Sequence, residues 1–351
     1  MTLEEIRKQL DKIDFQLLKL LNSRMELGLE TKKFKKSIED SDREAEVIEK
    51  IRTRSGALIA PQFCEKLFKE IISESKKLQN KNFQLVGYQG EHGAYGEVAA
   101  RKWNDNLVPI ACSEFTEVFE GVSSGLFDFG IVPVENTLGG VLSQVNQLIL
   151  NTDLFVVGAV TLPIHHCLLS VPGTDYRELR AVYSHYQALE QCHHFIARNN
   201  LEPVPFYDTA GAAKMIAEKR PTASAAIASK LCAELYDLEI IKENIEDFDS
   251  NITRFLVFSK DENNEKGEKC SIVFSTEHKA GTLFRALEVF AQKGINLTRI
   301  ESIPNLQGSF AFFLDFAGSK NDSNIAKALK EVQKLTSNFR LMGFYDEIQI
   351  D

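Results

Sequence analysis

The spacing of apolar residues changes abruptly near residues 80–82, and this change divides the chain into regions of different fold. Before it, apolar residues recur every three to four positions from Leu3 onward, which indicates long amphipathic helices. Beyond Phe83, short strand-like segments alternate with helical ones, which is typical of α/β architecture. At roughly 100–200 residues per domain, a chain of 351 residues is expected to hold two or three domains.

The first of these regions predicts three helices. Ser41 with Glu44 three residues later predicts a capping box at the start of the second helix, which Gly56 is expected to end. Pro61 is expected to begin the third helix. Three helices of which one is very long do not enclose a core of their own. The apolar stripe is therefore expected to pack against a second copy of the chain.

The α/β region predicts mostly parallel strands with helices between them. It includes one continuous strand over 154–170 and one continuous helix over 187–199. The polar segment 261–269 has no periodicity and predicts a linker. Beyond it, the order strand, helix, strand, strand, helix, strand, which ends with a strand over 339–349, predicts a ferredoxin-like fold.

Composition and charge exclude several classes of function. No run of about 18 apolar residues occurs, so no transmembrane helix is expected, and the N-terminal segment is too charged for a secretory signal. The six cysteines are scattered without a CxxC pair, so we expect reduced thiols in the cytoplasm, without disulfides or a metal site. A net charge of −9 argues against nucleic-acid binding. The helical region is locally basic, which favours a small anionic partner.

Polar side chains interrupt the apolar stripes of the helical region. For any one of them, a solvated salt bridge is the simpler interpretation. As a set they need buried partners, which a dianionic ligand would supply. The segments IRKQLDKIDFQLLKLLNSRMEL, SDREAEVIEKI and LFKEIISESKKLQ resemble the three helices of the all-helical chorismate mutase class. The resemblance implies a substrate-binding set of Arg7, Arg24, Lys35, Asp40, Arg43, Glu44, Ser75 and Gln79.

The resemblance also implies roles in the rearrangement of chorismate to prephenate, which involves no covalent bond to the enzyme. Catalysis then rests on positioning and electrostatics. The three arginines are expected to bind carboxylates. Lys35 and Gln79 are expected to stabilise negative charge on the ether oxygen, and Glu44 and Ser75 to hold the ring hydroxyl.

Arg7 and Arg24 are 17 residues apart on one predicted helix. At about 1.5 Å per residue they are separated by roughly 25 Å, whereas a pocket for a small ligand is on the order of 10 Å across. Both arginines therefore cannot bind one substrate from the same chain. We expect a site shared between two chains of a homodimer or a higher homo-oligomer.

The α/β region carries a series of short motifs. YQGEHGAYGEVAA, FGIVPVENTLGG, VTLPIHHCLLS, YSHYQALEQC, YDTAGAAKMIA, AAIASKLCAELY and NITRFLVFSK resemble prephenate dehydratases, and the resemblance extends to plant arogenate dehydratases. It implies two α/β lobes, like those of periplasmic binding proteins, with the site in the cleft between them. Gly96 and Tyr186 depart from the residues usual in that family. The implied substrate-binding residues are Glu135, Asn136, Thr137, Ser184, Gln187, Gln191 and Thr209.

The catalytic motif that this resemblance implies is Thr253-Arg254-Phe255. Prephenate would lose CO2 and water to give phenylpyruvate, and Thr253 would donate a hydrogen bond to the leaving hydroxyl. Arg254 is expected either to hold Thr253 in place or to attract a carboxylate. By residue type alone, an isolated threonine is more often only a strand residue. His165 and His166, which would point to opposite faces of a strand, are interpreted as structural.

The C-terminal residues 270–351 resemble an ACT regulatory domain through the segment AGTLFRALEVFAQKGINLTRIESIP. The resemblance implies L-phenylalanine as a possible effector. Ile303 stands where the family has a charged residue, which predicts weak regulation by phenylalanine. The implied effector-binding residues are Gly281, Thr282, Leu283, Glu301 and Ser302.

The sequence thus predicts a multidomain, bifunctional cytoplasmic enzyme. An all-α chorismate mutase domain at 1–80 precedes a two-lobed α/β prephenate dehydratase domain at 83–260 and an α+β ACT domain at 270–351. The expected partners are chorismate and prephenate, without a metal, an organic cofactor, nucleic acid or a membrane. Two alternatives stay open. One is a monofunctional prephenate or arogenate dehydratase whose helices serve only for dimerisation, and the other is a non-catalytic amino-acid sensor.

Overall fold

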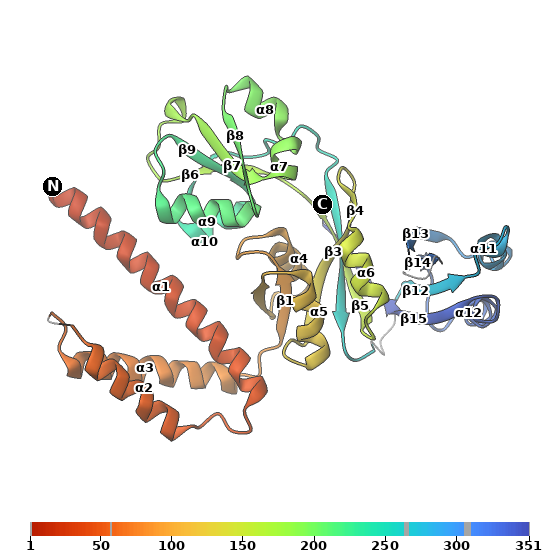
Figure 1. Ribbon diagram of the computed structural model, residues 1–351, viewed down its shortest axis with the longest axis horizontal. Helices are drawn as coiled ribbons and strands as arrows, with labels where there is room; N and C mark the ends of the chain where they lie inside the picture. Colours follow the sequence, from red (N-terminus) through yellow and green to blue (C-terminus); the bar gives the residue numbers. More distant parts are fainter. Residues whose placement is uncertain (1, 57, 263–266, 305–309, 351) are drawn as a thin grey trace. The chain divides into compact units, whose positions relative to one another are not determined.

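The computed structural model describes residues 2–56, 58–262, 267–304 and 310–350 (Figure 1). It separates into two compact units, residues 1–85 and residues 86–351. None of the helices in the described ranges combines the length and the apolar content needed to cross a bilayer.

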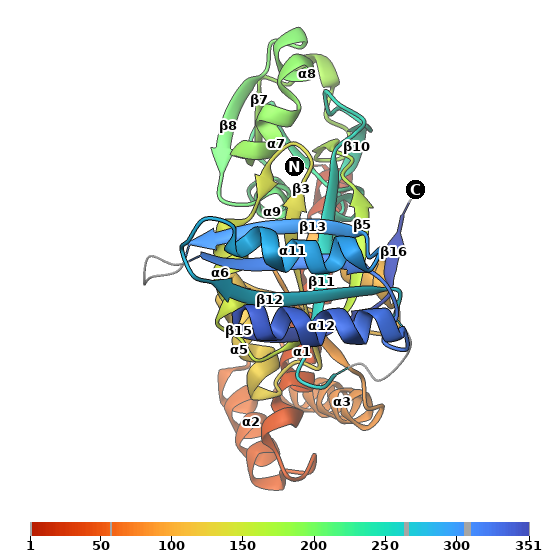
Figure 2. The ribbon, with the colours of Figure 1, turned by 90° about the vertical axis from the view of Figure 1, so that its right-hand side faces the viewer.

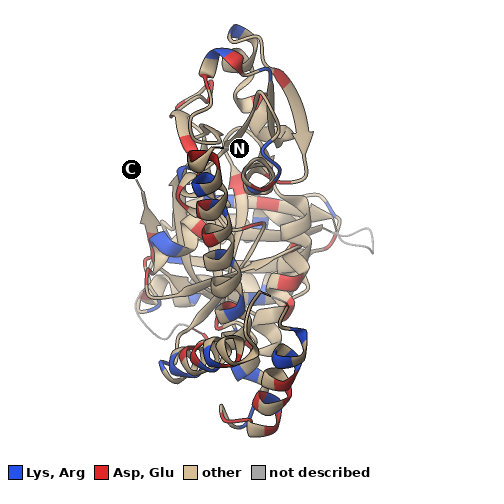
Figure 3. Ribbon diagram, turned by 90° about the vertical axis from the view of Figure 1, so that its left-hand side faces the viewer, with Lys and Arg blue, Asp and Glu red and all other residues tan. Residues whose placement is uncertain are grey.

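The first unit is helical. Gly28 lets two of its helices approach closely, because a Cβ there would lie 2.5 Å from Ser75 Oγ. Positions with Lys or Arg and positions with Asp or Glu are interspersed along the helices (Figure 3). The first and second helices both pack against the third, and the three are α1 (Leu3–Phe34), α2 (Ser41–Arg54) and α3 (Pro61–Asn80).

The starts of the second and third helices differ in how well the sequence predicted them. The capping box at Ser41 is wrong: Asp40 is the N-cap, because its Oδ1 accepts a hydrogen bond from Arg43 N at 3.1 Å. The helix ends two residues before Gly56 rather than at it. Pro61 occupies the first turn of α3, as predicted.

The second unit begins with two lobes, each built on one sheet (Figure 1). The strand order of the first sheet is β16 (Glu347–Gln349), β5 (Phe155–Pro163), β11 (Ile252–Ser259), β3 (Phe129–Asn136), β1 (Leu85–Gln89), β2 (Val108–Cys112), with β4 (Gly140–Val141) beside β3. The helices that follow its strands are α4 (Tyr95–Trp103), α5 (Phe115–Ser124) and α6 (Ser143–Leu150).

The second lobe has a five-stranded sheet and its own helices. The strand order is β10 (Glu239–Lys242), β6 (Cys167–Ser170), β9 (Ser224–Ala228), β7 (Ala181–His185), β8 (Glu202–Phe206). The helical segments are η1 (Tyr176–Glu178), α7 (Tyr186–Gln191), α8 (His193–Arg198), α9 (Thr209–Lys219) and α10 (Lys230–Tyr236).

Three local predictions for the two lobes are wrong. The strands are mixed rather than mostly parallel, because β11 runs antiparallel to both β3 and β5, and β6 runs antiparallel to β9. The strand expected over 154–170 is two strands in different sheets, because the chain crosses between the lobes after Pro163. The helix expected over 187–199 breaks at Cys192, whose backbone leaves the helical conformation.

The C-terminal part has the predicted βαββαβ order, with both helices on one face of a four-stranded sheet (Figure 2). The strand expected over 339–349 is divided, because the chain leaves this sheet after Tyr345 and adds β16 to the first lobe, parallel to β5. The elements are β13 (Leu297–Pro304), β14 (Phe310–Ala317), β12 (Lys269–Thr276) and β15 (Ser337–Tyr345) in sheet order, with α11 (Thr282–Gln292) and α12 (Ser323–Leu335).

A buried charged cluster joins the C-terminal sheet to the first lobe. Arg254 on β11 binds Asp315 through Nη1 at 2.5 Å, Glu347 through Nε at 2.7 Å and the Tyr345 hydroxyl through Nη2 at 3.1 Å. Asp315 also accepts a hydrogen bond from the Ser271 hydroxyl at 2.6 Å. Asp315 is fully buried, so each of its bonds replaces a bond to water.

Asp315→Asn should therefore destabilise the second unit. The change removes the carboxylate nearest to a buried guanidinium, and breaking a buried ion pair from one side costs about 3–5 kcal/mol. Urea unfolding followed by the fluorescence of Trp103, the single tryptophan, measures the effect. Asp346→Asn, at an exposed neighbouring position, is the control and should change stability by less than about 1 kcal/mol. Equal unfolding midpoints for the two variants would contradict the role of the cluster.

Candidate active sites

A cavity of about 330 Å³ lies among the three helices of the first unit. Arg7 is not among the residues that line it. The helix that carries Arg7 continues unbroken to Phe34, so Arg7 and Arg24 of the same chain are separated by roughly 25 Å, as predicted. The structure brings seven of the eight predicted residues together at this cavity, namely Arg24, Lys35, Asp40, Arg43, Glu44, Ser75 and Gln79.

Ion pairs and a buried amide shape the cavity wall. Lys35 Nζ lies 3.4 Å from Asp40 Oδ2. The N–H of Arg43 and the charge of Lys35 lower the pKa of Asp40, so this carboxylate is ionised at neutral pH. Gln79 Nε2 donates to Ser75 Oγ at 3.3 Å, and both side chains are buried. The cavity wall therefore combines charged side chains of both signs with uncharged hydrogen-bonding side chains.

Lys76 also lines this cavity, although the sequence analysis did not select it. Its Nζ lies 2.9 Å from Glu44 Oε1 and 2.9 Å from Glu39 Oε2. Helical spacing would have found it, since Ile72, Lys76 and Gln79 follow one another at intervals of four and three on α3.

A second cavity, of about 630 Å³, lies between the two lobes of the second unit. The positions Gly96 and Tyr186, which depart from the family pattern, line it. No Lys or Arg is among the described residues that line it. Five residues of the predicted dehydratase set reach this cavity, namely Asn136, Gln187, Gln191, Thr209 and Thr253.

Two other predicted residues, Glu135 and Arg254, lie on the face of the paired strands β11 and β3 that is opposite to the cavity. In their register, Thr253 faces Asn136 and Arg254 faces Glu135. Because successive side chains in a strand point to opposite sides, Thr253 and Asn136 reach the cavity while Arg254 and Glu135 do not. Glu135 instead lies 3.8 Å from Arg254 and 3.3 Å from Arg299 of β13.

Arg254 is accordingly not among the residues that line the cavity, and this geometry does not favour the expectation that it attracts a substrate carboxylate. Burial opposes the charged form, but Asp315, Tyr345 and Glu347 raise the pKa of Arg254 above its ordinary range. Its guanidinium is thus a permanent cation held towards the ACT domain. The remaining alternative, that Arg254 holds Thr253 in place, is compatible with this geometry.

Two further predicted residues make structural bonds outside the cavity. The Ser184 hydroxyl is fully buried and donates to Ile227 O at 2.6 Å. Thr137 Oγ1 donates to Ser250 O at 2.6 Å and accepts from Ile252 N at 3.0 Å. Both hydroxyls tie neighbouring segments together, so we do not assign them substrate contacts.

The hydrogen bonds around Thr253 fix the direction of its hydroxyl. Asn136 Oδ1 accepts from Leu138 N at 3.0 Å and from Gly139 N at 2.6 Å, which turns its amino group away from the loop. Asn136 Nδ2 then donates to Thr253 Oγ1 at 2.8 Å. Among the residues that the structure describes, no acceptor takes the Thr253 hydroxyl hydrogen. That hydrogen is available to a ligand in the cavity.

Two carboxylates that the sequence analysis missed hold the cavity rim. Burial raises the pKa of Glu97, but hydrogen bonds from His92, Gly93 N and Arg101 outweigh it and lower the value to about 2. Glu97 therefore anchors the glycine-rich loop before α4. Glu91 accepts hydrogen bonds from the Tyr207 hydroxyl and from Lys214, both at 2.9 Å, and so joins the two lobes.

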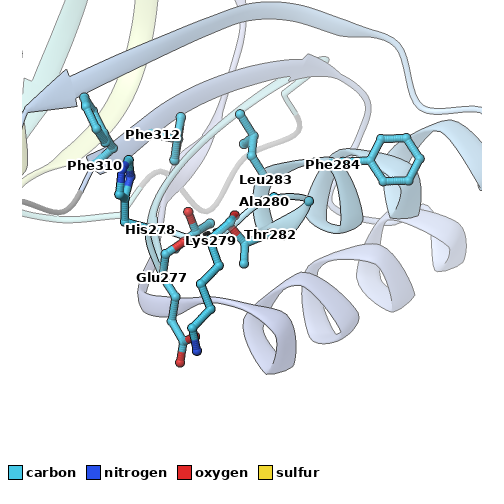
Figure 4. Close-up of a pocket in the computed structure, with 11 residues that line it drawn as sticks. Glu277, His278, Lys279, Ala280, Thr282, Leu283, Phe284, Phe310 and Phe312 are labelled. Atoms are coloured by element: carbon cyan, nitrogen blue, oxygen red, sulfur yellow. Dashed lines mark hydrogen bonds and ion pairs between the residues drawn. The ribbon is translucent and has the colours of Figure 1, made fainter.

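A third cavity, of about 350 Å³, lies at the start of α11 in the ACT domain (Figure 4). Gly281, Thr282 and Leu283 line it, together with His278 and Phe310, whose rings are 5.8 Å apart. Gly281 has a φ of +81°, a left-handed conformation that favours glycine.

The other two residues of the predicted effector set lie elsewhere. Glu301 and Ser302 belong to β13 and do not line the cavity of one chain. Ile303 is buried, at 3% exposure. In the described part of the chain, no group of His, Cys, Asp and Glu side chains is placed to hold a metal ion.

Comparison with known proteins identifies the family. A prephenate dehydratase model matches residues 86–263, a chorismate mutase type II model matches residues 6–80, and an ACT domain model matches residues 271–333. The bifunctional chorismate mutase/prephenate dehydratase of Aquifex aeolicus is 34% identical over 359 residues, which cover 98% of this chain and 97% of that protein. The chain belongs to the bifunctional chorismate mutase/prephenate dehydratase family.

Other relatives match about three quarters of the chain. Arogenate dehydratase/prephenate dehydratase 2, a chloroplast protein of Arabidopsis thaliana, is 38% identical over 285 residues, which cover 77% of this chain and 75% of that protein. The crystal structure of prephenate dehydratase from Arthrobacter aurescens in complex with L-Phe is similar, with a TM-score of 0.70 and 28% identity. That match covers 75% of this chain and 89% of that one.

Family membership confirms the predicted function. The chain is an enzyme with a chorismate mutase activity and a prephenate dehydratase activity, followed by an ACT domain, and it acts in phenylalanine biosynthesis. The mutase match and the nearly complete coverage of the Aquifex protein disfavour a monofunctional dehydratase with a helical arm. They equally disfavour a non-catalytic sensor.

Proposed function

We propose that chorismate binds in the cavity among α1, α2 and α3, and that prephenate binds in the cavity that contains Thr253. The convergence of seven predicted polar residues on one cavity carries the first assignment. We also propose domain boundaries at 1–80, 83–260 and 270–351, joined by the segment 261–269. Five of the six free cysteines are buried, which fits the reducing cytoplasm as the site of action.

The mutase cavity offers charges where the rearrangement needs them. Arg24 and Arg43 bind the carboxylates of chorismate through charge-assisted hydrogen bonds. Lys35 and Gln79 donate to the ether oxygen, on which negative charge develops as the C–O bond lengthens. Glu44, held by Lys76, and Ser75 fix the ring hydroxyl. No proton is transferred, so the rate comes from placing these donors before the reaction begins.

A second copy of the chain completes this cavity. The exposed residues Leu10, Ile13 and Leu17 lie on the first two thirds of α1, and each is 51–54% exposed. Burying this stripe against an antiparallel α1 from another chain removes it from water. The same pairing brings the partner's Arg7 to Arg24 and Lys35. We therefore propose a homodimer with two shared mutase sites.

The dehydratase cavity supplies one oriented donor to the leaving group. The bond from the ring carbon to the carboxylate breaks and releases CO2, and its electron pair enters the ring as the C–O bond to the hydroxyl breaks. The departing hydroxide takes up a proton from solvent and leaves as water. Thr253 donates a hydrogen bond to this oxygen, and that bond strengthens as charge develops there. Gln187, Gln191 and Thr209 are placed to bind the remaining polar groups.

The first turn of α4 is placed for the pyruvyl carboxylate. Ala94, Tyr95 and Gly96 line the cavity, and no side chain caps this helix. Unpaired backbone N–H groups and the helix dipole favour an anion at such a position. The substrate is thus held by amides and hydroxyls rather than by cationic side chains.

L-Phenylalanine is the proposed effector of the ACT domain. The similar dehydratase from Arthrobacter aurescens was solved in complex with L-Phe. The cavity at Gly281 combines aromatic and aliphatic walls, from Phe310 and Leu283, with the N-terminal turn of α11. Glu301 and Ser302 would reach the effector only from a second chain, because they do not line the cavity of their own chain.

Thr253→Val should abolish dehydratase turnover and leave mutase turnover unchanged. The change keeps the side-chain shape and removes the donor, and losing one such donor costs about 3–4 kcal/mol, or roughly 10²–10³-fold in kcat. Phenylpyruvate formation from prephenate measures the first activity, and loss of chorismate absorbance measures the second. A variant with near-normal phenylpyruvate formation would remove Thr253 from the mechanism.

Mixing Arg7→Ala with Arg24→Ala chains should restore mutase activity. Each variant alone lacks one arginine at both sites of the dimer. After joint unfolding and refolding, a mixed dimer has one site with both arginines and one site with neither. Chorismate consumption should therefore reappear in the mixture. If differently tagged chains demonstrably form mixed dimers and no activity returns, Arg7 does not act across the interface.

Phenylalanine should bind more weakly than to relatives with a charged residue at the position of Ile303. A charge-assisted hydrogen bond is worth about 1.5–3 kcal/mol, so the expected difference is roughly 10–100-fold in Kd. Titration calorimetry measures it, and Gly281→Ala, which strains the first turn of α11, should weaken binding further. Binding as tight as in those relatives would show that the charge at this position is irrelevant.

A further inference from the structure

A chain of hydrogen bonds runs from Thr253 into the hinge between the two lobes. Asn136, which donates to Thr253, also donates through Nδ2 to Asn251 Oδ1 at 2.8 Å. Asn251 Nδ2 donates to Gln191 Oε1 at 3.1 Å, and His166 Nε2 lies 2.9 Å from the same oxygen. Asn251 and His166 are 1% and 2% exposed, so water does not substitute for these bonds.

The two buried residues of this hydrogen-bond series, His166 and Asn251, lie on the two segments that connect the lobes. His166 lies between β5 and β6, and Asn251 lies between β10 and β11. Backbone bonds tie the segments together, from Ile164 N to Asn251 O at 2.8 Å and from Ile245 N to His166 O at 3.1 Å. The His166 ring therefore has a fixed position at the hinge.

The direction of each hydrogen bond in this series follows from the orientation of the Asn136 amide. The loop N–H groups fix the Asn136 amide, so Asn251 must present its oxygen to Asn136 and its amino group to Gln191. Gln191 then presents only an oxygen to His166. The Nε2 atom of His166 must carry a hydrogen in the neutral ring and in the charged ring alike.

The other ring nitrogen of His166 reaches the opposite lobe. Nδ1 lies 2.8 Å from the hydroxyl of Tyr95 on α4. His166 thus joins Tyr95 from the first lobe to Gln191 from the second, and all three side chains line the dehydratase cavity. The Tyr95 hydroxyl also donates to His165 O at 2.7 Å, so its single hydrogen lies within reach of both that carbonyl and His166 Nδ1. Burial lowers the pKa of His166, although Gln191 and Glu246 oppose this, which favours the neutral ring with its hydrogen on Nε2.

We propose that His166 is a positioning residue for the dehydratase reaction. Its Nε2–H holds Gln191 and, through it, the amide of Asn251, which keeps the Asn136 amino group directed at the oxygen of Thr253. The Thr253 hydroxyl then keeps its hydrogen for the leaving group. This inference rests on the proposed role of Thr253, and it replaces the structural interpretation of His166 with a functional one.

Three variants of the full-length enzyme test the proposal. His166→Leu removes both ring nitrogens and should lower dehydratase kcat roughly 10–100-fold with less than about a 3-fold change in KM, because the oriented hydrogen matters most in the transition state. His166→Gln retains a donor for Gln191 and an acceptor for Tyr95 and should recover kcat to within about 5-fold. His165→Leu is the matched control, since His165 is outside the cavity lining, and should stay within about 2-fold.

The urea unfolding midpoint followed by Trp103, which lies in the second unit, verifies that this unit is folded in each variant. Equal losses in the Leu and Gln variants, or a loss confined to KM, would overturn the proposal. His166→Leu should also cause no further loss in a Thr253→Val background, because the residue it positions is already absent. If Thr253→Val itself retains activity, the role of Thr253 fails. If Thr253→Val is inactive and His166→Leu is normal, only the role of His166 fails.

Discussion

The antiparallel pairing of β11 with β3 determines where the dehydratase chemistry and the ACT domain lie. Two consecutive residues on each strand point in opposite directions, so Thr253 and Asn136 line the cavity while Arg254 and Glu135 face the C-terminal sheet. One strand pair therefore carries the proposed hydrogen-bond donor, Thr253, on one side and the domain junction on the other. A shift of register by one residue would exchange the two roles.

The same constraint shows how much the sequence could predict. The resemblance to the chorismate mutase helices was enough to select seven residues that meet at one cavity, and helical spacing explains why Ser75 and Gln79 share one face of α3. Alternation in strands was applied to His165 and His166 but not to Thr253 and Arg254. The same rule, applied to that second pair, is enough to place the arginine on the face of β11 opposite to the threonine.

Other features depend on distant partners that a local pattern does not contain. Asn251 and Asn136 are 115 residues apart, and His166 and Gln191 belong to different elements, so no spacing rule links them. The same is true of β16, which continues a predicted strand but pairs with β5 in another sheet. Ser184 and Thr137 lie within dehydratase motifs, yet buried backbone carbonyls take their hydroxyl hydrogens. A motif identifies a segment but not which of its side chains face the ligand.

The contrast between the two cavities follows from the chemistry of their reactions. The cavity proposed for the mutase reaction has Arg24, Lys35 and Arg43 on its wall, and these cations would stabilise the negative charge that grows on the ether oxygen in that reaction. The dehydratase reaction instead expels a carboxylate as CO2, so a cation bound to that carboxylate would stabilise the reactant more than the transition state. The cavity residues that the structure describes include no Lys or Arg, and the nearest guanidinium in sequence, that of Arg254, is held on the opposite face of the sheet by Asp315 and Glu347. The buried ion pairs thus keep a positive charge away from the departing carboxylate while joining the ACT domain to the strand that carries Thr253.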